Sequence, residues 1–249
     1  MPRENRFWTA RRVAWYRRAN ARSDYADRVL AVVDDLLARS ASALDVGAGF
    51  GALALPLASR LSRVTAIEPA REMARTLRDD ARTLGLANVT VIEAAWSDVE
   101  VAPHDLVLCA HVGPLLGHGA PFLRAVPALA RRGVVLVRDV PGGDDKFFFR
   151  ELYPRLRGEP YERASDYEDT LAAIATLGVQ PTVTAIDYAS DQPFVSLEEA
   201  CDFWMEYMRL EGDAPRAFLR DFLRERLTRE GAGWIAPFRK RAAVIHWAV

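Results

Sequence analysis

Residues 43–58 read ALDVGAGFGALALPLA, and this stretch decides the fold of the 249-residue chain. The apolar run 42–46 predicts a buried strand, which leads into glycines at positions 47, 49 and 51 and then into an apolar helix. Glycine is required where φ is positive or where a ligand touches bare backbone. The start of the following helix adds unpaired N–H groups. The stretch therefore predicts a strand, a ligand-binding loop and a helix.

Outward from this loop, apolar runs and helical periods alternate. Strands are expected at 64–67, 89–92, 106–109 and 134–137, and helices at 51–61, 70–84 and 121–130. Residues 5–40 precede the first strand and have helical spacing. Strands separated by helices pair in parallel through right-handed crossovers. The pattern predicts an α/β fold with a doubly wound sheet.

Beyond Pro141 the rhythm changes. Helices are expected at 146–156, 167–177, 198–210 and 216–227, and strands at 182–188 and 241–249. Three regions follow: an N-terminal helical cap (1–40), a ligand-binding core (41–140), and the remaining strands with a helical insertion on the substrate side (141–249). No linker or repeat separates them, so we expect one integrated domain.

Composition excludes several classes of function. The formal net charge of −1 argues against a nucleic-acid partner recruited by overall charge. No run reaches signal-peptide or membrane-spanning length, so we expect a cytoplasmic protein that does not enter a membrane. The four histidines are scattered and no C-x-x-C or H-x-E spacing occurs, so no metal site is expected. Cys109 and Cys201 leave a disulfide open but suggest no oxidising compartment.

Two carboxylates indicate what the loop binds. Gly47, Gly49 and Ala52 also fit the G-x-G-x-x-A fingerprint of dinucleotide sites. Asp45, however, would repel a pyrophosphate at the mouth of the strand and suits a ligand with an amino group. Glu68 ends the second strand about twenty residues later, where a carboxylate accepts hydrogen bonds from ribose hydroxyls. The pattern favours a nucleoside ligand that carries an amino group and no phosphate.

The order DVGAGFG (45–51), IEPAREM (67–73), DLVLCAH (105–111) and GVVLVRD (133–139) resembles the class I S-adenosylmethionine-dependent methyltransferase family. The resemblance covers residues 40–140, and the combined spacing is more specific than any single motif. It implies a Rossmann-like, doubly wound, seven-stranded sheet whose last strand is antiparallel, with N-terminal helices and a helical insertion before that strand. Residues 182–188 would form the sixth strand and 241–249 the last.

The resemblance also assigns the cofactor contacts. Gly47, Gly49 and Gly51 would lie along the methionine and ribose, Glu68 would bind the ribose, and Pro69 and Met73 would flank the adenine. The chain departs from the family at Ala94 and Ala95, where Gly-Asp is common. Either Ala95 and the ring of Trp96 hold the adenine, or Asp98 reaches back to it. The expected cofactor-binding set is Asp45, Gly47, Gly49, Gly51, Glu68, Pro69, Met73, Ala95, Trp96, His111 and Tyr25.

His111, directly after the fourth strand, is the candidate catalytic base. Ligands of open α/β sheets bind beyond the carboxyl ends of the strands, and a histidine there can take a proton from an acceptor hydroxyl or amine. It can equally hydrogen-bond the cofactor or the backbone. His118 is a weaker candidate, and His104 and His246 are expected to be structural. From the aromatic N-terminal segment, Tyr25 or Trp15 is expected to reach the site.

These features predict a methyltransferase that acts on a small-molecule acceptor with S-adenosylmethionine as cofactor. RNA or protein methylation is an alternative, although residues 110–116, AHVGPLL, lack the Asn/Asp-Pro-Pro-aromatic motif of enzymes that methylate base amino groups. A methyltransferase-like domain without activity and an NAD(P)-dependent oxidoreductase are further alternatives. The sequence leaves the acceptor, the methylated atom and the oligomeric state open.

Overall fold

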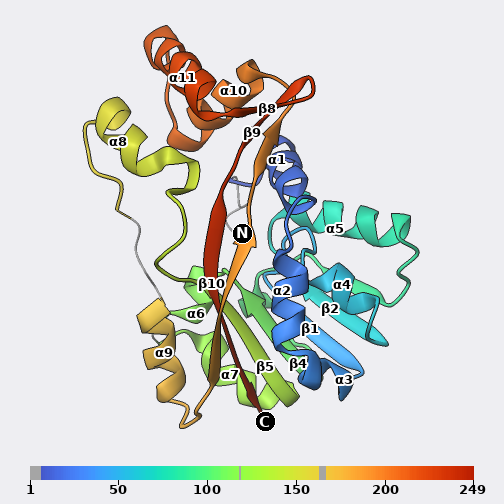
Figure 1. Ribbon diagram of the computed structural model, residues 1–249. Helices are drawn as coiled ribbons and strands as arrows, with labels where there is room; N and C mark the ends of the chain where they lie inside the picture. Colours follow the sequence, from blue (N-terminus) through green and yellow to red (C-terminus); the bar gives the residue numbers. More distant parts are fainter. Residues whose placement is uncertain (1–6, 118, 163–166) are drawn as a thin grey trace.

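The computed structural model describes residues 7–117, 119–162 and 167–249, and a seven-stranded sheet forms its centre (Figure 1). The strand order is β3-β2-β1-β4-β5-β10-β6. Neighbouring strands from β3 to β5 pair in parallel, whereas β10 pairs antiparallel with both β5 and β6. The predicted seven-stranded, Rossmann-like sheet with an antiparallel last strand is confirmed. Its strands are β1 (Ser42–Val46), β2 (Arg63–Ile67), β3 (Val89–Ile92), β4 (His104–Ala110), β5 (Ala130–Asp139), β6 (Thr182–Ala189) and β10 (Arg239–Ala248).

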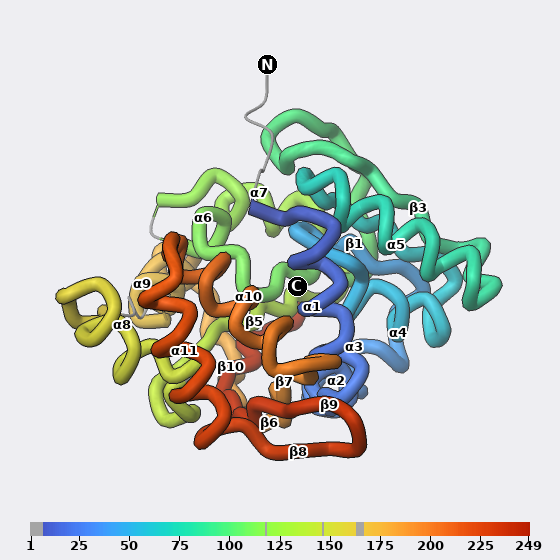
Figure 2. Tube along the Cα trace, turned by 90° about the horizontal axis from the view of Figure 1, so that it is seen from above, coloured from blue at the N-terminus to red at the C-terminus, as the bar shows by residue number. Residues whose placement is uncertain are grey.

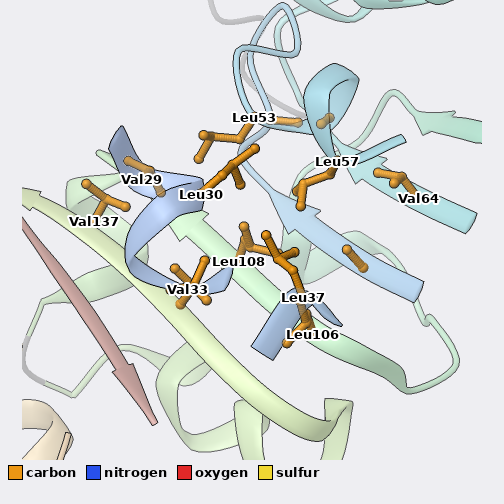
Figure 3. Close-up of a cluster of buried hydrophobic side chains, with 14 of the residues drawn as sticks. Val29, Leu30, Val33, Leu37, Leu53, Leu57, Val64, Leu106, Leu108 and Val137 are labelled. Atoms are coloured by element: carbon orange, nitrogen blue, oxygen red, sulfur yellow. The ribbon is translucent and has the colours of Figure 1, made fainter. Parts of the chain in front are cut away.

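One face of the sheet is covered by α2 (Tyr25–Val32), α3 (Asp34–Ala38), α4 (Ala54–Ala58) and α5 (Arg71–Thr83). Figure 3 shows Val33, between α2 and α3, Leu37 of α3 and Leu57 of α4 on the side of the sheet that carries Leu106 and Leu108 of β4. Each fully buried leucine contributes roughly 1.5–3 kcal/mol to the free energy of unfolding. The apolar runs of the sequence therefore form this layer.

The opposite face is covered by α6 (Gly113–Leu116), α7 (Pro121–Leu129) and α9 (Tyr167–Ala175). Phe122 and Ile174 are fully buried against it. Cys109 lies in β4 within this layer, and Cys201 lies in α10 (Leu197–Met208) at a distance in the fold; both are buried and free. The two thiols therefore form no disulfide.

A cap lies over the end of the sheet at which the parallel strands finish (Figure 1). It consists of α10, α11 (Asp213–Arg226) and a small antiparallel sheet in the order β7-β9-β8, with strands Gln192–Phe194, Gly233–Ala236 and Thr228–Glu230. The turn η2 (Lys146–Phe148) and α8 (Phe149–Arg157) join its aromatic core. The sequence pattern predicted only helices between β6 and β10, so the small sheet is an addition to the expected insertion.

The N-terminal segment folds as three helices, and residues 21–24 separate α1 (Ala10–Asn20) from α2. In Figure 2, α1 runs between α5 and α10. Its Arg17 pairs with Asp80 of α5, and its Arg18 pairs with Glu199 of α10 at 2.6 Å. The helix therefore joins the sheet layers to the cap by ion pairs on both sides. The helix after the glycine loop is also shorter than expected and begins at Ala54.

Within the three described ranges, no helix has both the length and the apolar character needed to span a bilayer.

Candidate functional site

A cavity of about 480 Å³ lies over the glycine loop at the carboxyl ends of β1, β2 and β4. Every residue of the expected cofactor-binding set lines it except Gly51. Further lining residues from the N-terminal segment and the loops are Trp8, Tyr16, Val46, Ala48, Phe50, Ala52, Leu53, Ile67, Ala110, Val112, Gly113, Pro114 and Leu115. The structure thus brings together residues that are spread over more than 100 positions of the sequence.

The three loop glycines serve different purposes. Gly47, Gly49 and Gly51 all have positive φ, at +76°, +58° and +95°. A Cβ at Gly47 would stand 2.3 Å from the Val112 side chain, whereas a Cβ at Gly49 would meet nothing within 4 Å and would project into open space. Gly49 is therefore the bare-backbone position of the cavity.

Gly51 does not line the cavity, which departs from the contact expected of it. A Cβ there would approach Leu77 of α5 to 2.3 Å and Leu55 to 2.9 Å. The close packing of this turn against α5 is by itself a reason for glycine at this position.

The Glu68 carboxylate lies at the end of β2 and is 6% exposed. Its Oε2 accepts a hydrogen bond from the Gly49 N–H at 2.8 Å, and its Oε1 accepts one from the Ala70 N–H at 2.7 Å. Burial raises the pKa of Glu68, while these two backbone hydrogen bonds oppose the rise. Since each carboxylate oxygen has two lone pairs, both can still accept from hydroxyl groups in the cavity.

Asp45, at the end of β1, is buried and faces the same cavity. Burial, followed by the nearby Glu68 carboxylate, raises the pKa of Asp45 to about 7. No group in the described part of the chain donates a hydrogen bond to this carboxylate. A cation beside it would lower its pKa again, so the site suits a ligand with a positive group.

The far end of the cavity is apolar. Pro69, Met73, Ala95 and the Trp96 ring line it, whereas Asp98 does not and instead accepts from the hydroxyl of Ser97 at 2.9 Å. Of the two adenine arrangements left open by the sequence, the described geometry favours Ala95 and Trp96. The Trp96 ring also contacts the Phe122 ring edge-on, with 5.2 Å between the ring centroids. Part of the Trp96 ring therefore packs against α7.

His111 lies just beyond β4 with a φ of 58° and lines the cavity. The backbone N–H of His111 donates to the Val137 carbonyl at 2.9 Å. The Nδ1 atom of its ring lies 3.5 Å from Oδ1 of Asp139, at the end of β5. A residue other than glycine in this backbone region costs about 1–3 kcal/mol and is often found at functional sites. The pair can take up a proton at His111 while Asp139 orients the ring and stabilises its charged form.

Asp139 was not among the residues predicted from the sequence. Its signal was available, since strand 133–139 ends in an aspartate at the edge where ligands bind, but the pairing with His111 depends on the β4–β5 register.

The tyrosine at position 25 reaches the site and the tryptophan at position 15 does not. The Tyr25 ring lies 5.5 Å from the His111 ring, and its buried hydroxyl has no hydrogen-bond partner within the described ranges. Trp15 is fully buried in the aromatic core of the cap, and its Nε1 donates to Oε1 of Glu199 at 3.1 Å. Its role is to attach α1 to the cap.

The two other described histidines do not line this cavity. His104 is buried, with Nε2 2.8 Å from the Thr65 hydroxyl, and His246 lies inside β10, in keeping with structural roles. His118 lies outside the described residues. No cluster of three or more metal-binding side chains occurs in residues 7–117, 119–162 and 167–249.

Comparisons with known proteins agree with this geometry. Residues 43–131 match the family model described as a methyltransferase domain. The ubiquinone biosynthesis O-methyltransferase of Methylocella silvestris is 41% identical over 93 residues, which are 36% of this chain and 36% of that protein. The match thus spans about a third of the curated relative. Residues 43–131 thus match a methyltransferase domain, in agreement with the resemblance that the motifs indicated.

Solved structures show the same fold at low sequence identity. A protein of Anaeromyxobacter dehalogenans described as a type II methyltransferase gives a TM-score of 0.55 at 18% identity, covering 88% of this chain and 95% of that one. Precorrin 8W decarboxylase of Methanobacterium thermoautotrophicum gives 0.51 at 17% identity, covering 90% of each chain. Magnesium protoporphyrin IX methyltransferase of Synechocystis PCC 6803, with bound S-adenosylhomocysteine, gives 0.50 at 14% identity over 89% of this chain and 82% of that one.

Proposed function

We propose that the protein transfers a methyl group from S-adenosylmethionine to an oxygen atom of a small-molecule acceptor. The observation that carries this proposal is the charge of the cavity over the glycine loop. Its lining includes the carboxylates of Asp45 and Glu68, but among the described residues no arginine or lysine lines it. A pyrophosphate would meet two acids and no cation there, whereas an adenosyl sulfonium with an amino group meets complementary charge.

The residues present fit this cofactor. Gly49 leaves the backbone open where a Cβ would project into the cavity, and Asp45 is a buried carboxylate without a hydrogen-bond donor in the described part of the chain. Asp45 would hold the amino group, Glu68 the ribose hydroxyls, and Met73 with Trp96 the adenine. When bound, the cofactor supplies an electrophilic methyl group on a sulfonium whose leaving group is neutral.

The protein's contribution to the reaction is positioning and proton removal. Holding the acceptor oxygen in line with the methyl group lowers the entropic cost of reaction. His111, oriented by Asp139 at 3.5 Å, is the group that would take the acceptor proton. The curated relative that the chain matches is an O-methyltransferase, which favours oxygen as the methylated atom.

Calorimetric titration of the purified protein with S-adenosylhomocysteine and, separately, with NAD⁺ tests the cofactor. We expect saturable binding of the first and none of the second; binding of NAD⁺ alone would overturn the proposal. Incubation with methyl-labelled cofactor and a pool of hydroxylated small molecules then tests catalysis. Cofactor binding without label transfer to any member of a broad pool would favour a domain that binds without turnover.

A further inference from the structure

A second cavity, of about 230 Å³, lies between the end of β5 and the cap. Its walls include four aromatic rings, those of Phe147, Phe149, Tyr161 and Tyr207. Its charged lining residues are Asp139, Asp144, Asp145, Arg150 and Lys240. For comparison, an engineered apolar cavity of about 150 Å³ holds a benzene molecule. The second cavity therefore has room for one substituted aromatic ring.

The two cavities meet at the His111–Asp139 pair. His111 lines the cavity over the glycine loop, Asp139 lines the second one, and their side chains are 3.5 Å apart. Tyr25 also lines the first cavity, and its ring centroid lies 5.5 Å from that of His111. A molecule in the second cavity thus lies beside the group that is placed to accept a proton.

One ring of the aromatic wall, Phe147, comes from a segment with strained backbone. Phe147 and Phe148 are consecutive left-handed residues, with φ of 60° and 56°. Such conformations persist in bulky residues only where the surroundings enforce them, and they concentrate at ligand sites. Here the Phe147 carbonyl accepts a hydrogen bond from Nε1 of Trp204 at 2.7 Å, inside the cap core. Phe147, one of the four rings of the wall, is therefore anchored to the core of the cap.

Some charged groups of this cavity already form hydrogen bonds within the protein, whereas among the described residues Lys240 has only a distant ion-pair partner. Asp144 accepts a hydrogen bond from the backbone N–H of Arg239 at 2.6 Å, and Asp145 accepts from that of Arg150 at 3.0 Å. Lys240, in contrast, has a side chain only 16% exposed, and its Nζ lies 4.0 Å from Oδ1 of Asp139. This ammonium group keeps donor capacity for a further partner.

We propose that the second cavity binds the methyl acceptor, and that the acceptor is a single aromatic ring with a hydroxyl group and a carboxylate. The carboxylate pairs with Lys240, the ring packs on the aromatic wall, and the hydroxyl faces His111. The hydroxyl oxygen forms the new bond to the methyl carbon, and the carbon–sulfur bond breaks with its electron pair passing to sulfur. The hydroxyl proton passes to the His111–Asp139 pair. This inference rests on the proposed methyl transfer from S-adenosylmethionine.

The test measures binding of 3-hydroxybenzoate, phenol and tyramine to the protein saturated with S-adenosylhomocysteine, by calorimetry or ligand-observed NMR. We expect 3-hydroxybenzoate to bind more tightly than either of the other two. In Lys240→Met its affinity should fall by about 10-fold or more, because a charge-assisted contact is lost. Arg241→Met is the matched control: it removes the neighbouring cation of β10, which pairs with Asp187 at 3.0 Å outside this cavity, and should leave the affinity unchanged.

Three outcomes would overturn the inference: no binding of 3-hydroxybenzoate, tighter binding of tyramine, or equal affinities in Lys240→Met and the unaltered protein. Titration of each variant with S-adenosylhomocysteine separates this failure from failure of the proposed function. Intact cofactor binding with an insensitive Lys240 contradicts only the acceptor class. Absence of cofactor binding in the unaltered protein contradicts the methyl-transfer proposal itself.

Discussion

The backbone N–H of Gly49 donates a 2.8 Å hydrogen bond to Oε2 of Glu68, so one carboxylate holds the glycine loop and also faces the cavity above it. Its second oxygen accepts from the N–H of Ala70, at the start of α5. The shape of the loop and the binding of a nucleoside therefore depend on the same side chain.

Replacing Glu68 with alanine should weaken S-adenosylhomocysteine binding by about 10-fold or more, because at least one hydrogen bond to a charged acceptor is lost. The free energy of unfolding should also fall by roughly 1–3 kcal/mol, since the N–H groups of Gly49 and Ala70 lose their acceptor. Calorimetry and chemical denaturation measure the two effects. Glu72→Ala is the control, because Glu72 pairs with Arg75 on α5 and does not line the cavity. If both variants bound S-adenosylhomocysteine with equal affinity, Glu68 would not be a ribose-binding residue.

Gly49→Ala should lower cofactor affinity at a limited cost in stability. The added methyl group meets no protein atom within 4 Å and enters the space that the ligand needs, while the φ of +58° imposes backbone strain of about 1–2 kcal/mol. Gly85→Ala is matched to it, with a φ of +70° and equally open surroundings, but lies after α5 away from the cavity. Both variants should lose similar stability in denaturant titrations, and only the first should lose affinity. A loss of affinity in both would show that strain, not occupancy, is responsible.

The raised pKa of Asp45, about 7, predicts a pH dependence of cofactor binding. The ionised carboxylate attracts an amino group and the protonated one does not, so affinity should rise by about 10-fold between pH 6 and pH 8. Without ligand, the free energy of unfolding changes with pH in the opposite direction to the cofactor affinity. Because the folded chain binds this proton more tightly than the unfolded chain, the Asp45 contribution to the free energy of unfolding falls as the pH rises from about 4 through 7. Asp45→Asn should flatten both dependences, and an unchanged binding profile in that variant would assign the effect to another group.

Tyr25→Phe removes a buried hydroxyl that has no hydrogen-bond partner in the described part of the chain. Loss of such a group avoids a desolvation cost, so the free energy of unfolding should stay equal or rise by about 1 kcal/mol. Affinity for S-adenosylhomocysteine should fall, since Tyr25 lines the cavity and its hydroxyl keeps a donor available for the ligand. Marked destabilisation would mean that Tyr25 supports the fold instead.

His111→Asn tests the proton acceptor, and asparagine is the suitable replacement because it tolerates the positive φ of 58° at this position. With an acceptor identified in the pooled assay, kcat should fall by about 10²–10⁴-fold while KM for the cofactor changes little. Asp139→Asn should have a smaller effect in the same direction, as its role is to orient His111. A kcat unchanged in His111→Asn would leave positioning as the whole of the catalysis.

The features predicted correctly from the sequence are those encoded locally. The strand Ser42–Val46, the loop behind Asp45 and the acid Glu68 follow from residue types at short spacing, and the structure places all of them as the motifs indicate. The small sheet escaped prediction because its strands are three or four residues long, and β7 contains Pro193, a residue that argues against a strand.

The features missed at the site depend on pairing over long sequence separations. Asp139 becomes a partner of His111 only through the alignment of β4 with β5. The role of Gly51 depends on where α5 packs, which the motif alone does not contain.

The chain enters the cap after β6 and returns from it to β10 at neighbouring positions. There the N–H of Ser190 donates to the carbonyl of Phe238 at 2.8 Å. The register of β6 with β10 does not depend on the length of the segment between these two residues. The entropic penalty of closing a longer segment also grows only slowly with its length. Changes in the length of this segment should therefore leave the pairing of β6 with β10 intact. Such changes would still alter the core that the cap shares with Trp15 of α1 and Phe147 of η2.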